Sequence, residues 1–180
     1  LQRRDRPRVE RVAMTLFAAD HGVVAEGVSA FPQSVTLAMI RNFAQGGAAM
    51  SVLARQLDTD LEIINLGTAT PQESLPGVVV LEIAPGTANF CQAPAMTEDQ
   101  LRKAQAAGRA DAQRAAAQGA DLFITGEMGI GNTTAAAAVA ASLLDRPGAD
   151  LSGRGTGLDA AGLARKQAAI ERGLALHGRH

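Results

Sequence analysis

Four short apolar runs alternate with longer helical patterns along the chain, and this alternation limits the possible folds more than any other feature. The runs cover residues 12–19, 61–67, 78–84 and 121–126. Uninterrupted apolar runs of this length are typical of strands that a parallel sheet buries on both faces. Parallel strands need crossover connections, which the helical patterns between the runs can supply. The sequence therefore predicts an α/β fold.

The helical spacing of apolar residues predicts the connecting elements. The expected helices cover residues 32–44, 48–57, 97–118, 133–144 and 159–176. Segment 133–144 consists almost entirely of Ala, Val and Leu, so we expect this helix to be buried on every side. Together the elements predict a single α/β domain over residues 1–180. We expect a three-layer, mostly parallel Rossmann-like sheet with helices on both faces.

The charge balance disfavours one large class of partner. The chain carries 17 Lys and Arg residues against 18 Asp and Glu residues, a net charge of −1. Proteins that bind duplex nucleic acid usually carry a basic excess. Aromatic residues make up only 3% of the chain, and Trp and Tyr are absent, which leaves few platforms for stacking bases. We therefore expect no nucleic-acid partner.

Cysteine content and hydropathy indicate the compartment. Cys91 is the single cysteine, which excludes an internal disulfide framework and a multi-cysteine zinc site. No run approaches the length of a membrane-spanning helix, so no membrane partner is expected. No basic segment followed by an apolar run opens the chain, so no signal peptide is predicted. The expected location is cytoplasmic.

One glycine-rich segment carries the strongest chemical signal. It reads Gly126-Glu127-Met128-Gly129-Ile130-Gly131-Asn132-Thr133-Thr134. Its glycines let backbone amides approach a ligand closely, and the start of the following helix favours an anion. The segment therefore predicts a phosphate site, although it differs from the P-loop because no Lys follows the last Gly. A tight strand-to-helix turn with an Asn or Thr cap is the alternative.

Three further features could serve such a site. Lys166 lies in the first two turns of the last expected helix, where the helix dipole disfavours a cation unless an anion binds nearby. The Gly-rich turn Gly153–Gly157 precedes that helix and could face a ligand. Glu127 could bond a sugar hydroxyl or assist acid/base chemistry. The alternatives are a solvated lysine, a flexible connection and a carboxylate that caps a neighbouring amide.

The end of the first apolar run carries a polar pair. Asp20 and His21 could act as acid and base, although adjacent strand residues point apart. Phe31 and Met39 lie in and after the following loop, where they could line a pocket for a flat aromatic ligand or belong to the core. In an open α/β sheet, ligands bind beyond the carboxyl ends of the strands, which is where these segments are expected.

Four ordered blocks match a known pattern and extend over most of the chain. They are residues 19–23 with 27–36, 46–49, 126–134 and 153–159. These blocks resemble the family of nicotinate-nucleotide:dimethylbenzimidazole phosphoribosyltransferases. The resemblance implies exchange of nicotinate on nicotinate mononucleotide for 5,6-dimethylbenzimidazole, giving α-ribazole 5′-phosphate for the lower ligand of cobalamin. It also implies these two small molecules as substrates, no cofactor or metal, and a homodimer.

The same resemblance implies roles for individual residues. The residues that would hold the 5′-phosphate are Gly129, Ile130, Gly131, Asn132, Thr133, Thr134 and Lys166. Phe31 and Met39 would lie against the incoming base. Glu127 would stand near the ribose and the departing nicotinate as a supporting catalytic residue.

The sequence departs from the family in length, because the family's chain is much longer. Residues 1–180 look like its large domain, without the small helical domain and without the C-terminal part that carries the general base. Little activity is therefore expected of these residues alone. Two other functions stay open: a non-catalytic nucleotide- or phosphate-binding module derived from this family, and a different transferase that shares only the glycine loop.

Overall fold

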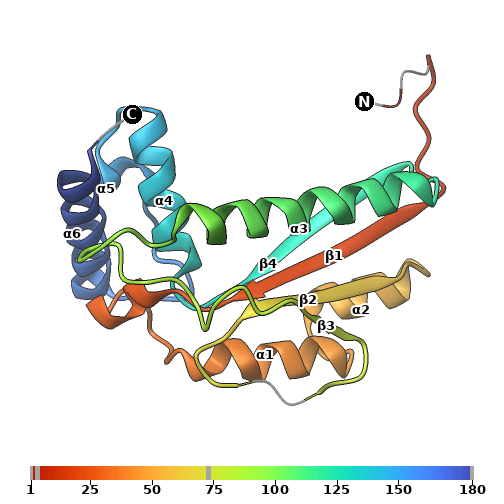
Figure 1. The fold of residues 1–180 in the computed structure, drawn as a ribbon, viewed down its shortest axis with the longest axis horizontal. Helices are drawn as coiled ribbons and strands as arrows, with labels where there is room; N and C mark the ends of the chain where they lie inside the picture. The colour runs from red at the N-terminus through yellow and green to blue at the C-terminus, as the bar shows by residue number, and fades with distance from the viewer. Residues whose placement is uncertain (1, 3–4, 72–73, 179–180) are drawn as a thin grey trace.

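A parallel sheet organises the chain in a computed structural model that describes residues 2, 5–71 and 74–178. Within these residues the strand order is β3-β2-β1-β4, and every neighbouring pair is parallel. The strands are β1 (Val12–Ala19), β2 (Leu61–Gly67), β3 (Val78–Val80) and β4 (Leu122–Met128). The expected α/β fold is confirmed (Figure 1).

Helices cover both faces of this sheet, as the sequence predicts. The helices are α1 (Ser34–Ala44), α2 (Ala49–Gln56), α3 (Glu98–Ala117), α4 (Asn132–Leu143), α5 (Gly148–Leu151) and α6 (Ala160–His177). Figure 1 shows α3 on one side of the sheet and α1 and α2 on the other, while α4, α5 and α6 gather beyond the carboxyl ends of the strands. The short α5 and the 3₁₀ helix η1 (Gly22–Glu26) were not predicted from the sequence.

Strand β3 is shorter than the predicted run 78–84. It ends at Val80, although the N–H of Leu81 still donates to the Asn65 carbonyl oxygen at 2.9 Å. Glu82 then adopts a φ of +24°, which takes the backbone out of the extended conformation. The prediction of a strand through residue 84 is therefore wrong, because apolar character continues where the backbone already turns.

Strand β4 is longer than the predicted run 121–126. Glu127 pairs with Phe17, and Met128 pairs with Ala18, so the parallel ladder with β1 continues to Met128. Glu127 is therefore a strand residue next to the glycine loop and not part of a tight turn.

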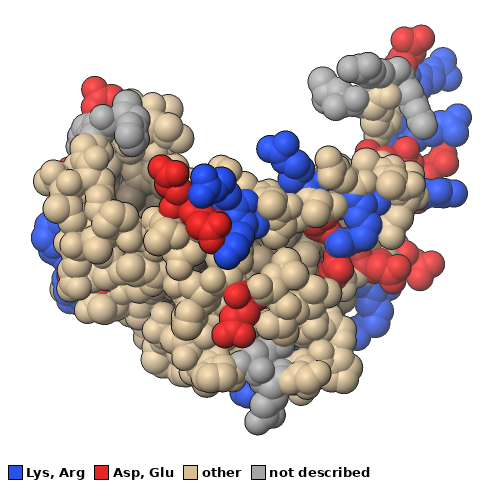
Figure 2. Space-filling model, viewed as in Figure 1, with Lys and Arg blue, Asp and Glu red and all other residues tan. Residues whose placement is uncertain are grey.

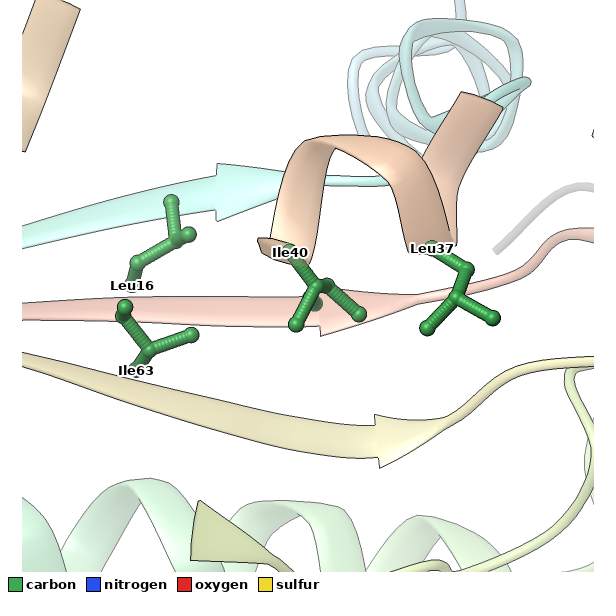
Figure 3. Close-up of a cluster of buried hydrophobic side chains, with 5 residues drawn as sticks. Leu16, Leu37, Ile40 and Ile63 are labelled. Atoms are coloured by element: carbon green, nitrogen blue, oxygen red, sulfur yellow. The ribbon is translucent and has the colours of Figure 1, made fainter. Parts of the chain in front are cut away.

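The main core lies between the sheet and α1. Leu16 of β1 and Ile63 of β2 meet Leu37 and Ile40 of α1, and all four are buried (Figure 3). Leu37 and Ile40 are three residues apart, which places both on one face of the helix. Burial of each such side chain contributes about 1.5–3 kcal/mol. This contact fixes α1 against the strands that carry the site.

A second contact holds the helices beyond the strand ends together. Ala137 and Ala141 of α4 pack with Ile170 and Leu174 of α6. Both alanines lie on one face of α4, four residues apart. This packing holds α4 against α6, and both helices contribute to the site described below.

The predicted burial of segment 133–144 on every side is wrong. Val139, Leu143 and Leu144 are 59%, 68% and 62% exposed. Only one face of α4 packs against α6, so the other face stays open although it carries apolar side chains. In the view of Figure 2, charged side chains gather over the α3 side and the N-terminal end of the chain, and few lie over α4 and α6. Among the helices that the structure describes, none is long and apolar enough to cross a membrane.

Candidate active site at the strand ends

Asp20 connects the carboxyl ends of the neighbouring strands. Its N–H donates to the Gly67 carbonyl oxygen, and its own carbonyl oxygen accepts from Thr87, both at 3.0 Å. The buried Asp20 carboxylate accepts from the Ala69 N–H at 2.8 Å through Oδ2. Asp20 thus holds loops from two parts of the chain at this edge of the sheet.

His21 points into a different environment from Asp20, as expected for adjacent residues of extended backbone. Its ring lies against Gly129, because a Cβ added there would come within 3.0 Å of His21 Cδ2 and 3.1 Å of Nε2. Burial lowers the pKa of His21, and the Asp20 carboxylate opposes this shift with a smaller effect. The imidazole is therefore neutral at pH 7.

The glycine loop is shaped by close contacts that exclude side chains. A Cβ at Gly129 would lie 2.2 Å from the Ala19 carbonyl oxygen, which is a severe clash. Gly131 has a φ of +92° and forms the N-cap of α4, a conformation that favours glycine. These two positions explain why the loop needs glycine where it passes the end of β1.

Several amides of this loop are already bonded within the chain. The Ile130 N–H donates to Thr36 Oγ1 at 3.1 Å, and the Thr133 N–H donates to Asn132 Oδ1 at 2.7 Å. The N–H of Thr134 donates to the Gly131 carbonyl oxygen at 3.0 Å. The Oδ1 of Asn132 is thus occupied by the Thr133 N–H, and the Nδ2 of the same side chain is the group that could donate to an anion in the groove.

Lys166 reaches the same place from α6. The side chain is 1% exposed, and its Nζ donates to Thr133 Oγ1 at 2.8 Å and to the Gly153 carbonyl oxygen at 3.0 Å. Burial lowers the pKa of the Lys166 ammonium. A Cβ added at Gly155 would lie 3.7 Å from this Nζ, so the turn Gly153–Gly157 also borders the lysine. The structure therefore brings together the glycine loop, the second Gly-rich turn and Lys166.

A groove of about 720 Å³ opens beside this cluster. It lies between α3, α4 and the sheet face that carries Phe17, and most of its wall is apolar. Asn132 and Thr133 line the groove, so it borders the lysine cluster. Glu127 and His21 are the titratable residues in its described lining. The arrangement combines an anion-binding end, two ionisable groups and an apolar cavity, which suits a nucleotide with a flat base.

A family model described as phosphoribosyltransferase matches residues 1–180. The chain belongs to this family. The nicotinate-nucleotide–dimethylbenzimidazole phosphoribosyltransferase of Pseudomonas aeruginosa strain LESB58 is 62% identical over 180 residues, which are 100% of this chain and 51% of that protein. The protein of the same name from Pseudomonas putida strain KT2440 is 61% identical over 178 residues, 99% of this chain and 51% of the relative. The predicted family is thereby confirmed.

Solved structures of this phosphoribosyltransferase family give the same result. CobT from Thermus thermophilus superposes with a TM-score of 0.89 at 48% identity, over 94% of this chain and 51% of that one. A second structure from the same organism, of the named phosphoribosyltransferase, has a TM-score of 0.84 at 46% identity, over 94% of this chain and 50% of that one. The chain thus spans about half the length of the relatives it matches.

The two predicted base-binding residues, Phe31 and Met39, lie apart from the groove. Phe31 precedes α1 and is 46% exposed. Met39 lies within α1, where its Sδ accepts from Asn42 Nδ2 at 3.8 Å. Neither residue is part of the described lining of the groove. Their role against the incoming base stays a prediction, as do the roles of Glu127, Lys166 and the glycine loop.

Some contacts of the site could not be predicted from the sequence. Thr36 accepts from the glycine loop, yet it lies nearly a hundred positions away and is an ordinary residue of a helix. Met96 lines the groove just before α3, and Gln100 lines it from the first turn of that helix, where it also forms a capping box with Thr97. The sequence places His21 at the end of a strand, but it does not predict the contact of His21 with Gly129. Within residues 2, 5–71 and 74–178, no group of three or more His, Cys, Asp or Glu residues is arranged to hold a metal ion.

Proposed function

We propose that this chain supplies the nucleotide-binding part of an enzyme that exchanges nicotinate on nicotinate mononucleotide for 5,6-dimethylbenzimidazole and releases α-ribazole 5′-phosphate. The observation that carries the proposal is the buried Lys166 ammonium, which lies on Thr133 at the end of the glycine loop. A buried ammonium without a carboxylate partner is costly unless an anion joins it. The names of the relatives support the identity of the substrates.

Phosphate binding would use the charge of Lys166 and the hydroxyl of Thr133. Lys166 has three N–H donors, and two of them donate to Thr133 Oγ1 and Gly153 O in the structure. A phosphate oxygen could take the third, or replace Thr133 as partner. The N-terminal end of α4 adds a partial positive charge. Charge-assisted bonds of this kind are about twice as strong as neutral ones.

Glu127 would act on the ribose. Loss of nicotinate from a quaternary ring nitrogen leaves positive charge on the sugar in the transition state. A carboxylate beside the sugar stabilises that charge, and Glu127 projects from β4 into the groove beside the phosphate end. The benzimidazole must also lose its N–H proton, which calls for a general base. The resemblance assigns that base to the C-terminal part of the longer family chain.

Ligand binding tests the site, and a second lysine provides the control. Lys166→Ala and Asn132→Ala should each weaken nicotinate mononucleotide and inorganic phosphate, by roughly 1–3 kcal/mol for a charge-assisted contact. Lys103 is exposed on α3 and pairs with Asp99 at 2.7 Å, so Lys103→Ala should leave both affinities unchanged. Calorimetric titration measures all three variants. Unchanged affinity in both site variants would refute the site.

A base-exchange assay by chromatography tests the reaction. A protein of full family length should convert both substrates, and Glu127→Gln should lower its turnover. Chain 1–180 alone should turn over poorly if the general base lies outside it. Binding without turnover at full length would favour the non-catalytic module instead. The homodimeric state and the cytoplasmic location stay predictions.

A further inference from the structure

Two ionisable side chains of the groove, His21 and Glu127, differ from its other polar side chains in their hydrogen bonding. Most of its polar side chains are already bonded: Gln100 to the Thr97 N–H, Thr87 to the Gly22 N–H, and Thr133 to Lys166. For the His21 ring and the Glu127 carboxylate, no hydrogen bond or ion pair joins them to another described residue. Polar groups that border a cavity and lack protein partners are candidates for ligand contacts.

The position of His21 restricts which part of a ligand it can meet. Its ring lies against Gly129, and a Cβ added at Gly131 would come within 3.3 Å of His21 Cβ. The residue therefore packs on the glycine loop itself, next to the phosphate end of the groove. In a nucleoside monophosphate the group adjacent to the phosphate is the ribose, and the heterocycle lies farther away.

The chemistry of the ring fits the same part of the ligand. A neutral imidazole offers one N–H donor and one nitrogen acceptor. A sugar hydroxyl also donates once and accepts, so the two groups are complementary. A phosphate or a carboxylate only accepts, and it is served better by the Lys166 ammonium.

We propose that His21 is a second substrate-contacting residue of this site and that its imidazole hydrogen-bonds a ribose hydroxyl of the bound nucleotide. The proposal rests on the function proposed above. It assigns the sugar contact to a residue that follows β1 and packs on the glycine loop, while Thr133 at the end of that loop and Lys166 of α6 would hold the phosphate.

The experiment compares ligands that contain and lack the sugar. Calorimetry measures the dissociation constants of inorganic phosphate, ribose 5-phosphate and nicotinate mononucleotide. His21→Phe should weaken the two sugar phosphates about three- to tenfold, the range for one hydrogen bond, and leave inorganic phosphate unchanged. His21→Gln, which keeps a donor and an acceptor, should restore part of the loss. His177→Gln is the matched control, because His177 bonds the Phe90 carbonyl oxygen outside the groove.

A spectroscopic readout does not depend on the variants' folding. In the wild-type chain, the ring ¹H–¹⁵N signals of His21 should shift on addition of ribose 5-phosphate and stay unmoved with saturating inorganic phosphate.

The outcomes separate the two proposals. If Lys166→Ala weakens every ligand while His21→Phe weakens none and the ring signals stay fixed, the His21 contact is refuted and the proposed function stands. An equal loss for inorganic phosphate in His21→Phe would mean that the ring only shapes the loop, which also refutes the contact. A loss for nicotinate mononucleotide alone would assign His21 to the heterocycle and refute the ribose contact. If the wild-type chain binds none of the three ligands, both proposals fail.

Discussion

Thr36 and Thr134 are both completely buried, yet only one of the two hydroxyls has a described partner. Thr36 Oγ1 accepts from the Ile130 N–H, whereas Thr134 Oγ1 has no partner within the described residues. Loss of one partner leaves a buried group unsatisfied, but removal of an unpaired hydroxyl can be neutral or stabilising. Thr36→Val should therefore cost about 1–3 kcal/mol, and Thr134→Val should be neutral or stabilising.

Urea unfolding of the two valine variants measures this difference directly. Both substitutions keep the β-branched shape, so the comparison isolates the hydroxyl. Equal losses of stability would mean that Thr134 has a partner, such as a buried water, that the protein contacts do not reveal.

The buried Lys166 ammonium makes stability depend on pH. Its pKa is lowered by burial, so between that lowered pKa and the ordinary lysine value of about 10.4 the unfolded chain holds more protons than the folded chain. The free energy of unfolding should therefore rise with pH across this window and fall as the pH drops through the folded pKa. Urea unfolding of wild type and Lys166→Met from pH 8 upward should show a rise only in wild type.

Saturating phosphate is the control for that measurement. A bound anion favours the charged lysine, so the rise with pH should become smaller. Parallel pH profiles for wild type and Lys166→Met, with and without phosphate, would contradict the assignment of the titration to Lys166.

At the residue scale, the sequence predicted the contacts that depend on local pattern. The glycine loop and Lys166 come together as expected, because Gly129 and Gly131 are needed where the chain passes β1 and helix α6 returns Lys166 to the same edge. The contact of Thr36 with Ile130 could not be predicted, since nothing in a single sequence pairs residues so far apart.

An ionic cluster joins helix α3 to the sheet. Arg114 bonds both Asp111 of the same helix and Glu62 of β2, and the Asp111 carboxylate is almost completely buried. Removal of Arg114 would leave this buried carboxylate without its cation. Arg114→Leu should therefore destabilise the protein by about 1–3 kcal/mol.

Arg102 provides the comparison on the same helix. It pairs with Glu98 at 3.7 Å on the exposed surface, where such pairs contribute about 0–1 kcal/mol. Arg102→Leu should thus change stability much less than Arg114→Leu in urea unfolding. A loss in Arg102→Leu that matches the loss in Arg114→Leu would refute a special role for the buried cluster.

At the element scale, apolar pattern predicted which elements exist better than where they end. Runs 12–19 and 61–67 are strands over those same ranges. The prediction of a strand over residues 78–84 fails after Val80, because the backbone turns at Glu82 although the run stays mostly apolar. Helix α4 shows a different limit of prediction from sequence. Its apolar composition indicates a tendency to be buried, but it does not reveal whether another element covers the helix.

At the scale of the whole molecule, the described residues expose apolar surface on α4 and leave one edge of β4 without a neighbouring strand. Val139 and Leu143 are largely exposed, and β4 lies at the edge of the described sheet. Such surfaces promote association. We expect chain 1–180 to form dimers or larger species in sedimentation at low micromolar concentration, and Val139→Glu with Leu143→Glu to shift it toward monomer.

Leu101 on α3 is the control for this effect, since it is also exposed but lies on another helix. Leu101→Glu should leave the sedimentation profile unchanged. A wild-type chain that sediments as a clean 18.5 kDa species would show that neither surface drives association.

The strand order also affects how the chain can fold during synthesis. β1 lies between β2 and β4, and about a hundred residues separate it from β4 in the sequence. A ribosome that adds about 5–20 residues per second completes β4 roughly 5–20 s after β1. During that time β1 and β2 can pair, but the other edge of β1 has no partner and can template wrong pairing. The nascent chain is therefore most exposed to misfolding before Met128 has left the ribosome, and a pause in translation within α3 would prolong that interval.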